Sequence, residues 1–274
     1  MYCRRYYQNA MQVALERDDW SCFQTEESMY YQENGEVRKR EENLLREHHF
    51  HIFLNGTPYA VLVCTPMQLT ALVVGHLATS CIIADVSDIK KIEYNEDNSN
   101  CQVWLWKENV AEYIDKEWIT SSENNQKIYE ALKVPEVREN TFVWKPEWIT
   151  AMAEMFRKDT ELHASTHGTH SCFLGRGGKI LYVCEDIGRH NALDKAVGMG
   201  MLNGIALSDC MIYISGRVPL DMLGKIIRTR IPLIASNTVP TSQSVALAKQ
   251  KNITLIGKAR PNGFIIYADG RKDG

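Results

Sequence analysis

The second half of the chain alternates short apolar runs with helix-forming segments, and this alternation restricts the fold more than any other feature. The strand candidates are residues 180–183, 210–214, 232–235, 253–256 and 264–267. The helix candidates between the first four are residues 189–202, 219–229 and 241–250. Pro219 opens the second helix, and Thr241 or Ser242 caps the third. Such alternation predicts right-handed crossovers and a largely parallel sheet with helices on its faces.

The first half of the chain has a less regular pattern. Residues 1–41 are charged and polar with poor periodicity, and we expect a loosely held arm that is partly helical. Apolar and polar residues then alternate on both sides of Asn55-Gly56, a dipeptide typical of a tight β-hairpin. A helix is expected next, with Thr65 as its N-cap and Pro66 at its first position.

A second hairpin is expected at residues 89–106, and Pro146 lies near the start of a further helix. Residues 107–145 are polar and carry no clear periodicity. The predicted organisation is therefore a charged N-terminal arm at 1–41, a β-rich part with one helix at 42–145, and an α/β core at 146–274.

Composition excludes several classes of protein. The 274 residues carry a formal net charge of −3, which argues against a basic surface for nucleic acid over the whole protein but not against a local basic pocket. No apolar run is long enough to span a bilayer, and the start of the chain lacks the apolar centre of a secretory signal. We therefore expect a soluble, cytoplasmic protein with no membrane partner. No two of the eight cysteines are separated by only two residues, which excludes zinc ribbons and thioredoxin-type pairs.

The segments that follow the first four strand candidates have a common chemical character. They read CEDIGRHN, SGRVP, SNTVPTS and GKARPNG, and are rich in hydroxyls, amides and cations. Together with Lys195, four residues after the first segment, they supply Arg189, His190, Ser215, Arg217, Ser236, Asn237, Thr238, Lys258 and Arg260. Ligands of such sheets bind beyond the carboxyl ends of the strands, and helix N-termini with arginine side chains suit anions. The sequence therefore predicts a pocket for a large ligand that carries phosphate groups.

Each of these residues also has a purely structural interpretation. Gly188 would let the chain enter a helix, with Asp186 capping it. His190 and Asp194 are four residues apart, as are Asn191 and Lys195, and both spacings are typical of pairs on a helix surface. Four successive strand ends of the same character favour the pocket over this alternative.

The stretch THGTHSC places His167, His170 and Cys172 close together, and imidazole and thiolate suit zinc. Their spacing matches no zinc motif and no second pair of ligands is evident, so no metal site is expected. The alternative is a tight backbone turn at Gly168 and Thr169, with His170 facing the pocket.

Taken together, THGTHSC, EDIGRHNALDKAVG, SGR, NTVPT and TLIGKARPNGFIIY resemble the formate dehydrogenase accessory family, the FdhD-type sulfur carriers. The stretch NGTPYAVLVCTPMQLTALVVGHLATSCII resembles the first part of that family, so the likeness runs from about Glu42 to the C-terminus. It implies a cytidine-deaminase-like three-layer α/β core joined to a smaller N-terminal β-rich part, in a homodimer.

The resemblance also implies a role in formate dehydrogenase maturation. Members receive sulfur as a persulfide from a cysteine desulfurase and pass it to the molybdenum (or tungsten) bis-molybdopterin guanine dinucleotide cofactor before its insertion into the apoenzyme, which is a sulfurtransferase activity. With the strand-end segments, this gives a predicted cofactor-binding set of Gly168, Thr169, His170, Asp186, Arg189, His190, Asn191, Asp194, Lys195, Ser215, Arg217, Ser236 and Thr238. The family's cofactor-contacting segment matches Lys258, Ala259, Arg260, Pro261, Asn262 and Gly263.

The chain departs from the family at the Cys-x-x-Cys pair, because the matching segment at 119–126 reads ITSSENNQ and holds no cysteine. A persulfide needs an exposed thiol, preferably as thiolate. The replacement candidates are Cys172, whose pKa the neighbouring His170 would lower, and Cys184 at a strand end. Otherwise the protein is a cofactor chaperone without sulfur transfer. A nucleotide deaminase, suggested by fold analogy, would need His-x-Glu and Pro-Cys-x-x-Cys motifs, which the sequence lacks.

Overall fold

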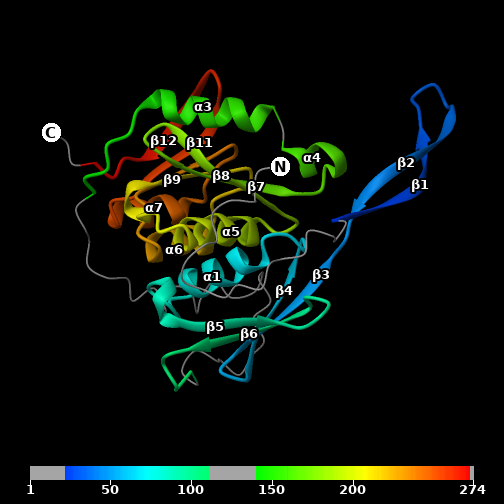
Figure 1. Cartoon of the computed structure of the whole chain (residues 1–274). Coiled ribbons are helices and arrows are strands. Elements are labelled where there is room, and N and C mark those ends of the chain that lie inside the picture. The colour runs from blue at the N-terminus through cyan, green and yellow to red at the C-terminus, as the bar shows by residue number, and fades with distance from the viewer. Residues whose placement is uncertain (1–21, 111–139, 159, 272–274) are drawn as a thin grey trace.

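The computed structural model describes residues 22–110, 140–158 and 160–271 (Figure 1). Its N-terminal half contains β1 (Phe23–Tyr31), β2 (Val37–Leu45), β3 (His48–Leu54), β4 (Thr57–Cys64), α1 (Leu69–Thr79), β5 (Ile89–Tyr94) and β6 (Asn100–Leu105). Its C-terminal half contains α3 (Pro146–Arg157), α4 (Glu161–Thr166), β7 (His170–Arg176), β8 (Lys179–Asp186), α5 (Arg189–Leu202), β9 (Met211–Ile214), α6 (Leu220–Arg228), β10 (Leu233–Ser236), α7 (Ser242–Gln250), β11 (Thr254–Arg260) and β12 (Gly263–Ala268).

A six-stranded sheet in the order β12-β11-β10-β9-β7-β8 forms the centre of the C-terminal half. β9, β10 and β11 are parallel, whereas β7 is antiparallel to both of its neighbours and β12 to β11. All five predicted strands and all three predicted crossover helices are present. The sequence analysis missed β7, which pairs with β8 through a turn that needs positive φ at Gly177 and Gly178.

Helices cover both faces of this sheet, which confirms the three-layer α/β core (Figure 1). Successive residues of β9 point to opposite faces: Tyr213 packs with Met152 of α3, whereas Ile212 and Ile214 belong to the core on the side of α5 and α6. This alternation of buried side chains explains why a run that is apolar at every position forms a central strand.

The N-terminal half adds a four-stranded sheet in the order β4-β3-β6-β5. The expected hairpin at Asn55-Gly56 joins β3 to β4, and both residues have positive φ. The second expected hairpin is β5–β6. Pro146 is the first residue of α3, as predicted. The prediction that Thr65 caps α1 is wrong, because the helix begins at Leu69. The Thr65 hydroxyl instead donates a hydrogen bond to the buried carboxylate of Asp186.

Helix α1 lies between this sheet and α5, and the two helices touch backbone to backbone (Figure 1). A Cβ atom at Gly75 would lie 1.7 Å from the carbonyl oxygen of Asp194, and one at Gly198 would lie 1.9 Å from that of Ala71. Glycine on both helices is therefore what allows the two halves of the molecule to pack this closely.

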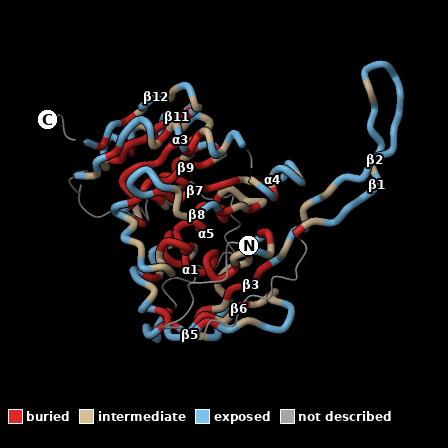
Figure 2. The backbone as a smooth tube through the Cα atoms, turned by 45° about the horizontal axis from the view of Figure 1, so that its top comes forward, coloured by how far each residue is buried: buried red, intermediate tan, exposed pale blue. Residues whose placement is uncertain are grey.

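Strands β1 and β2 form a separate antiparallel ribbon that extends away from the body (Figure 1). Figure 2 shows that most of it is exposed. The expectation of a partly helical arm is wrong for residues 23–41, which lie in this ribbon, while residues 1–21 lie outside the described residues. The missed signal is Asn34-Gly35, a hairpin dipeptide whose glycine has φ +86, placed among charged residues that also favour helices. In the part of the chain that the structure describes, no helix is long and apolar enough to cross a membrane.

Candidate functional site

The predicted strand ends meet at one edge of the central sheet. β8, β9, β10 and β11 run in the same direction, so their carboxyl ends are neighbours, and His170 at the start of β7 pairs with Asp186 at the end of β8. We call the following residues the strand-end edge: His170, Arg189, Ser215, Arg217, Ser236, Thr238, Lys258 and Arg260. The structure thus brings together segments that are up to 90 residues apart in the chain.

Hydrogen bonds link the loops of this edge. The Ser215 hydroxyl lies 3.2 Å from His170 Nδ1 and accepts from the Ser171 N–H at 3.0 Å. The Ser236 hydroxyl donates to the Gly216 carbonyl at 2.6 Å and lies 3.1 Å from the Thr238 hydroxyl. These contacts hold the loops after β9 and β10 together beside the start of β7.

The same linkage reaches the cationic residues. The Lys258 N–H donates to the Thr238 carbonyl at 2.6 Å, and the Arg260 guanidinium donates to the Asn237 carbonyl at 2.6 Å. A Cβ atom at Gly216 would lie 3.4 Å from Arg189 Cδ and 3.6 Å from His170 Nδ1, so these two side chains flank Gly216. The edge is therefore continuous from Arg189 to Arg260.

Positive charge at this edge is not neutralised by protein. Among the described residues, no acidic side chain forms an ion pair with Arg189, Arg217, Lys258 or Arg260. Arg189 Nε is buried and has no hydrogen-bond partner among the described residues. Arg189 is also the first residue of α5, whose N-cap, Gly188, has no side chain to bind the free N–H groups of the first turn. This combination suits an anion.

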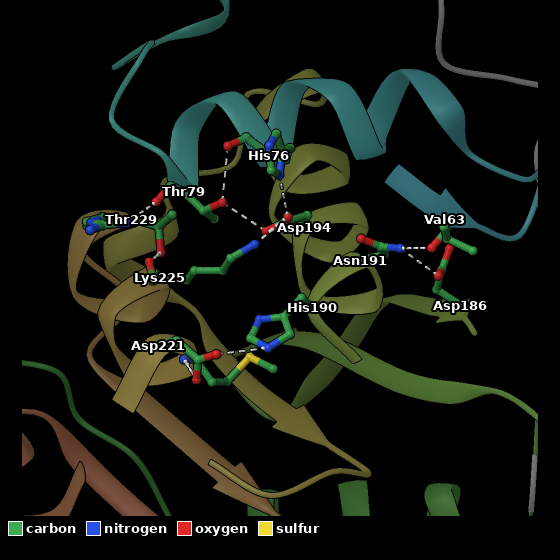
Figure 3. Close-up of polar contacts among 12 residues, drawn as sticks. Val63, His76, Thr79, Asp186, His190, Asn191, Asp194, Asp221, Lys225 and Thr229 are labelled. Carbon is green, nitrogen blue, oxygen red and sulfur yellow. Dashed lines mark hydrogen bonds and ion pairs between the residues drawn. The ribbon is translucent and has the colours of Figure 1, made fainter. Parts of the chain in front are cut away.

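The environment of the edge also shifts the pKa values of two side chains, His170 and Asp221. Burial and the positive charge of Arg189 lower the pKa of His170, so this imidazole is neutral at neutral pH. His190 Nε2 lies 3.1 Å from Asp221 Oδ2 at the start of α6 (Figure 3). Burial raises the pKa of Asp221, but the His190 contact and nearby positive charge outweigh it and the net pKa is lowered. Asp221 is therefore an ionised carboxylate directed at His190.

Asp186, Asn191 and Lys195 also belong to the predicted set, but their polar groups bind protein. Lys195 Nζ lies 2.7 Å from Asp186 Oδ2, and both side chains are fully buried. The other oxygen of Asp186 accepts from the Gly188 N–H at 2.8 Å and from the Asn191 amide at 3.0 Å. Lys195 further donates to the Thr65 hydroxyl at 2.8 Å, and Thr65 donates to Asp186 at 3.1 Å. This cluster ties the end of β4 to the start of α5.

Asp194 likewise joins three helices (Figure 3). Its carboxylate binds Lys225 of α6 at 2.5 Å, and His76 and Thr79 of α1 at 3.2 and 2.9 Å. Burial raises its pKa, but Lys225 and His76 more than compensate and hold the pKa at about 2. The alternative that His190–Asp194 and Asn191–Lys195 are helix-surface pairs is wrong, because all four residues are buried and their named partners lie elsewhere.

Gly168 and Thr169 connect α4 to β7, and the predicted turn at these two residues is wrong, because the chain bends at His167, whose φ is 51°. The Thr169 hydroxyl donates to Glu185 at 3.0 Å, and the same carboxylate accepts from the His163 N–H at 2.9 Å in the first turn of α4. Gly168 lies against Leu45, where a Cβ would be 2.8 Å from Leu45 Cδ1. These two residues therefore connect the edge to α4 and to the base of the β1–β2 ribbon.

The candidate thiols lie in the core. Cys172 and Cys184 are fully buried and face one another across β7 and β8. Burial raises the pKa of Cys172 well above its usual range, so the expectation that His170 lowers this pKa is wrong. Of the seven described cysteines only Cys81 is exposed. Segment 119–126 lies outside the described residues, and the described residues contain no group of three or more side chains that could hold a metal ion.

Sequence reasoning missed the residues that support the edge from other parts of the fold: Thr65, His76, Glu185, Asp221 and Lys225. Thr65 and His76 lie more than 100 residues from their partners, so no local motif joins them. The sequence shows that Thr65 and Glu185 can form hydrogen bonds, but it does not show which residues they bind.

Comparison with known proteins shows which family the chain belongs to. A model of the FdhD/NarQ family matches residues 45–272. The "Sulfur carrier protein FdhD" of Bacillus subtilis (strain 168) is 30% identical over 240 residues, which cover 86% of this chain and 92% of the relative. The protein of the same name from Listeria innocua is 30% identical over 244 residues, covering 86% and 93%.

Among solved structures, a putative formate dehydrogenase accessory protein from Desulfotalea psychrophila has the same fold. The TM-score is 0.74 at 24% identity, and the match covers 90% of this chain and 97% of that one. The strands and loops that form the strand-end edge lie entirely within the region matched by the family model. The chain belongs to the FdhD/NarQ family.

Proposed function

We propose that this chain is an accessory protein of formate dehydrogenase maturation that binds the molybdenum (or tungsten) bis-molybdopterin guanine dinucleotide cofactor at the strand-end edge as its cargo. Its partners would be a cysteine desulfurase and the dehydrogenase apoenzyme, in the cytoplasm. The role is supported by the likeness to sulfur carrier proteins and to a solved putative formate dehydrogenase accessory protein. The observation that carries the site is Arg189, whose buried Nε has no partner among the described residues and lies at an uncapped helix N-terminus.

The chemistry of the edge fits such a cargo. The two pyrophosphate groups of a bis-guanine dinucleotide need several cationic and N–H donors, and Arg189, Arg217, Lys258 and Arg260 have no acidic partner among the described residues. The hydroxyls of Ser215 and Thr238 belong to the same edge, where they contact His170 and Ser236. Asp186, Asn191, Asp194 and Lys195 would act by holding α5 in place, because their side chains already bind protein groups.

Sulfur transfer to the cargo is the second part of the proposal, and a chaperone without this activity is the alternative. The alternative is favoured by the thiols: Cys172 and Cys184 are buried, the pKa of Cys172 is raised, and segment 119–126 has no cysteine. A buried thiol of raised pKa is a poor acceptor of sulfur because the thiolate is the reactive form.

Guanine nucleotide binding tests the site. GDP titrated by calorimetry should bind the wild type, and Arg189→Ala and Arg260→Ala should each weaken binding by about 1.5–3 kcal/mol, as for hydrogen bonds to charged groups. Arg157→Ala is the matched control, because Arg157 is an exposed residue of α3 that pairs with Glu154. Unchanged affinity in both edge variants would overturn the assignment.

Sulfur transfer is tested with a cysteine desulfurase and radiolabelled cysteine, followed by a non-reducing gel. Label that disappears in Cys172→Ala but persists in Cys81→Ala would support sulfur relay through Cys172. A protein that binds GDP but acquires no label on any thiol would support the chaperone.

A further inference from the structure

Cys172 and Cys184 are directly opposite one another in the antiparallel pair of β7 and β8 (Figure 1). Both side chains point to the α5 face of the central sheet, where they belong to one buried cluster, whereas Phe173 points to the α3 face. Among the strands that the structure describes, no other two cysteines are paired in register. The pairing of the sheet therefore makes these two thiols neighbours.

The spacing of an antiparallel strand pair suits a disulfide. Directly opposite residues have Cα atoms about 4.5 or 5.5 Å apart, and disulfides form over Cα distances of about 4.4–6.8 Å. The Cβ atoms of such residues lie about 4.5–5.5 Å apart, against about 3.5–4.5 Å in a disulfide, so the two strands need to approach by about 1 Å. Cys172 and Cys184 can thus be joined without a change of strand register.

The surroundings of the two thiols keep them reduced while the sheet is closed. Burial raises the pKa of Cys172, and the neighbouring Cys184 raises it further. Neither residue has any exposed surface. Because the thiolate is the reactive form and needs access to its oxidant, the pair reacts only when part of the sheet opens.

Strand β8 is the part of the sheet that is free to open. It forms one edge of the six-stranded sheet and pairs with β7 alone among the described strands. Val183, next to Cys184, is 38% exposed. Edge elements with exposed residues open locally at a lower free energy than the core does. Such an opening presents Cys184 to a small oxidant, whereas Cys172 lies on a strand that is also held by β9.

We propose that Cys172 and Cys184 are a redox site at which hydrogen peroxide forms a disulfide between β7 and β8. The Cys184 thiolate attacks one oxygen of the peroxide, which breaks the O–O bond, releases hydroxide and leaves a sulfenic acid on Cys184. When β8 closes, the Cys172 thiolate attacks the Cys184 sulfur and displaces its oxygen as hydroxide. The two thiol protons convert both hydroxides to water, so two thiols and one peroxide give one disulfide and two water molecules.

The pair has a consequence for sulfur transfer, and this consequence rests on the proposed function. If Cys172 received sulfur as a persulfide, the Cys184 thiolate would attack the inner sulfur, the disulfide would form and the outer sulfur would leave as hydrogen sulfide. The outer sulfur is reduced in this step, so no other oxidant is needed. The pair therefore discharges a persulfide instead of storing it, which favours the chaperone over sulfur relay through Cys172.

Peptide mapping tests the proposal. Wild-type protein is treated with hydrogen peroxide under native conditions, blocked with iodoacetamide in denaturant and digested with trypsin without a reductant. Cleavage at Lys and Arg places Cys172 in the peptide 159–176 and Cys184 in the peptide 180–189, and each peptide contains one cysteine. Mass spectrometry should find these two peptides joined, with two hydrogen atoms fewer than their sum, and dithiothreitol should separate them.

Single substitutions identify the thiols that form the cross-link. They are made together with Cys81→Ala, which removes the one exposed thiol of the described residues and so prevents disulfides between molecules. Cys172→Ala and Cys184→Ala should each lack the cross-link. Cys210→Ala is the matched control and should form it to the same extent as Cys81→Ala alone, because Cys210 is equally buried and precedes β9 without a cysteine in register.

Three outcomes overturn the proposal. The two peptides are recovered separately after peroxide treatment, with their cysteines either alkylated or oxidised to sulfinic acid; or Cys172 and Cys184 are joined to other cysteines as often as to each other; or the cross-link forms only in denaturant. The wild-type measurement needs no substitution, so a variant that fails to fold does not affect it.

Calorimetry with GDP separates this proposal from the proposed function. Protein that binds GDP but forms no cross-link would keep the cargo site and reject the redox site. Protein that forms the cross-link but binds no GDP would keep the redox site and reject the cargo site.

Discussion

At the scale of single residues, Arg217, Lys258 and Arg260 of the strand-end edge are exposed, while the residues that support the edge are among the most buried charges of the molecule. Lys195 and Asp186 have no exposed surface, yet each makes several polar contacts besides their own ion pair. Burying two charges is unfavourable unless such contacts are complete. The position of α5 at the edge therefore depends on this pair.

Replacing Lys195 by Met should lower the free energy of unfolding by about 3–5 kcal/mol, because Asp186 is left charged and unpaired in the core. Unfolding in urea measures the change. Lys91→Met is the control, since Lys91 pairs with Glu93 at the surface and should have little effect. Equal stability of the two variants would show that the buried pair contributes no more than a surface pair.

Asp194 should make stability depend on acid pH. Its pKa is about 2 in the folded protein and 3.8 in the reference state, so the ionised carboxylate stabilises the fold above about pH 4 and this contribution is lost as pH falls from about 4 to about 2. The difference corresponds to about 2 kcal/mol at 1.36 kcal/mol per unit. Urea unfolding of the wild type and of Asp194→Asn at pH 6 and pH 3 should show a gap that narrows in acid. A gap that is the same at both pH values would contradict this explanation.

At the scale of elements, the contact between α1 and α5 depends on two glycines. Gly198→Ala should destabilise the protein by about 1–3 kcal/mol or more, because the new Cβ would meet the backbone of Ala71, which cannot move without shifting α1. Gly200→Ala, in the same helix, is the control. Its Cβ would meet the side-chain ends of Leu207 and Leu174, which can rotate away. Thermal unfolding should therefore show the larger loss for Gly198→Ala.

The elements of the C-terminal half could be predicted because each apolar run is short, is bounded by Gly, Pro or a capping hydroxyl, and alternates with a helix. Helix α7 illustrates this, because Thr241 caps it through Ser244 as expected. Strand β7 was missed because the sequence before it was interpreted as a turn at Gly168 and Thr169, and only pairing with β8 and β9 makes the residues from His170 onward a strand.

The strand-end edge could be predicted because parallel strands place their carboxyl ends together. What could not be predicted was which polar residues near those ends are buried. Arg189 and Lys195 are six residues apart in one motif, yet Arg189 belongs to the edge and Lys195 is fully buried against Thr65. That distinction depends on the N-terminal half, which covers α5 from a distance of more than 100 residues in the sequence.

At the scale of the whole molecule, the charges have an asymmetric distribution that the net value of −3 conceals. Negative charge is concentrated in the ribbon, at Glu26, Glu27, Glu41 and Glu42, and unpaired positive charge is concentrated at the strand-end edge. Composition alone excluded a wholly basic protein, but it could not show that negative and positive charges lie on different parts of the molecule.

Direct backbone contact at Gly75 and Gly198 also limits how the molecule can move. Opening one half of the molecule against the other would have to break this contact, because no side chains lie between the two helix backbones at these glycines. We therefore expect the six-stranded sheet and the four-stranded sheet to move together, without a hinge motion between them. If the proposed function holds, binding and release of the cargo would depend on the short loops after β9, β10 and β11, which can rearrange without moving the two helices apart.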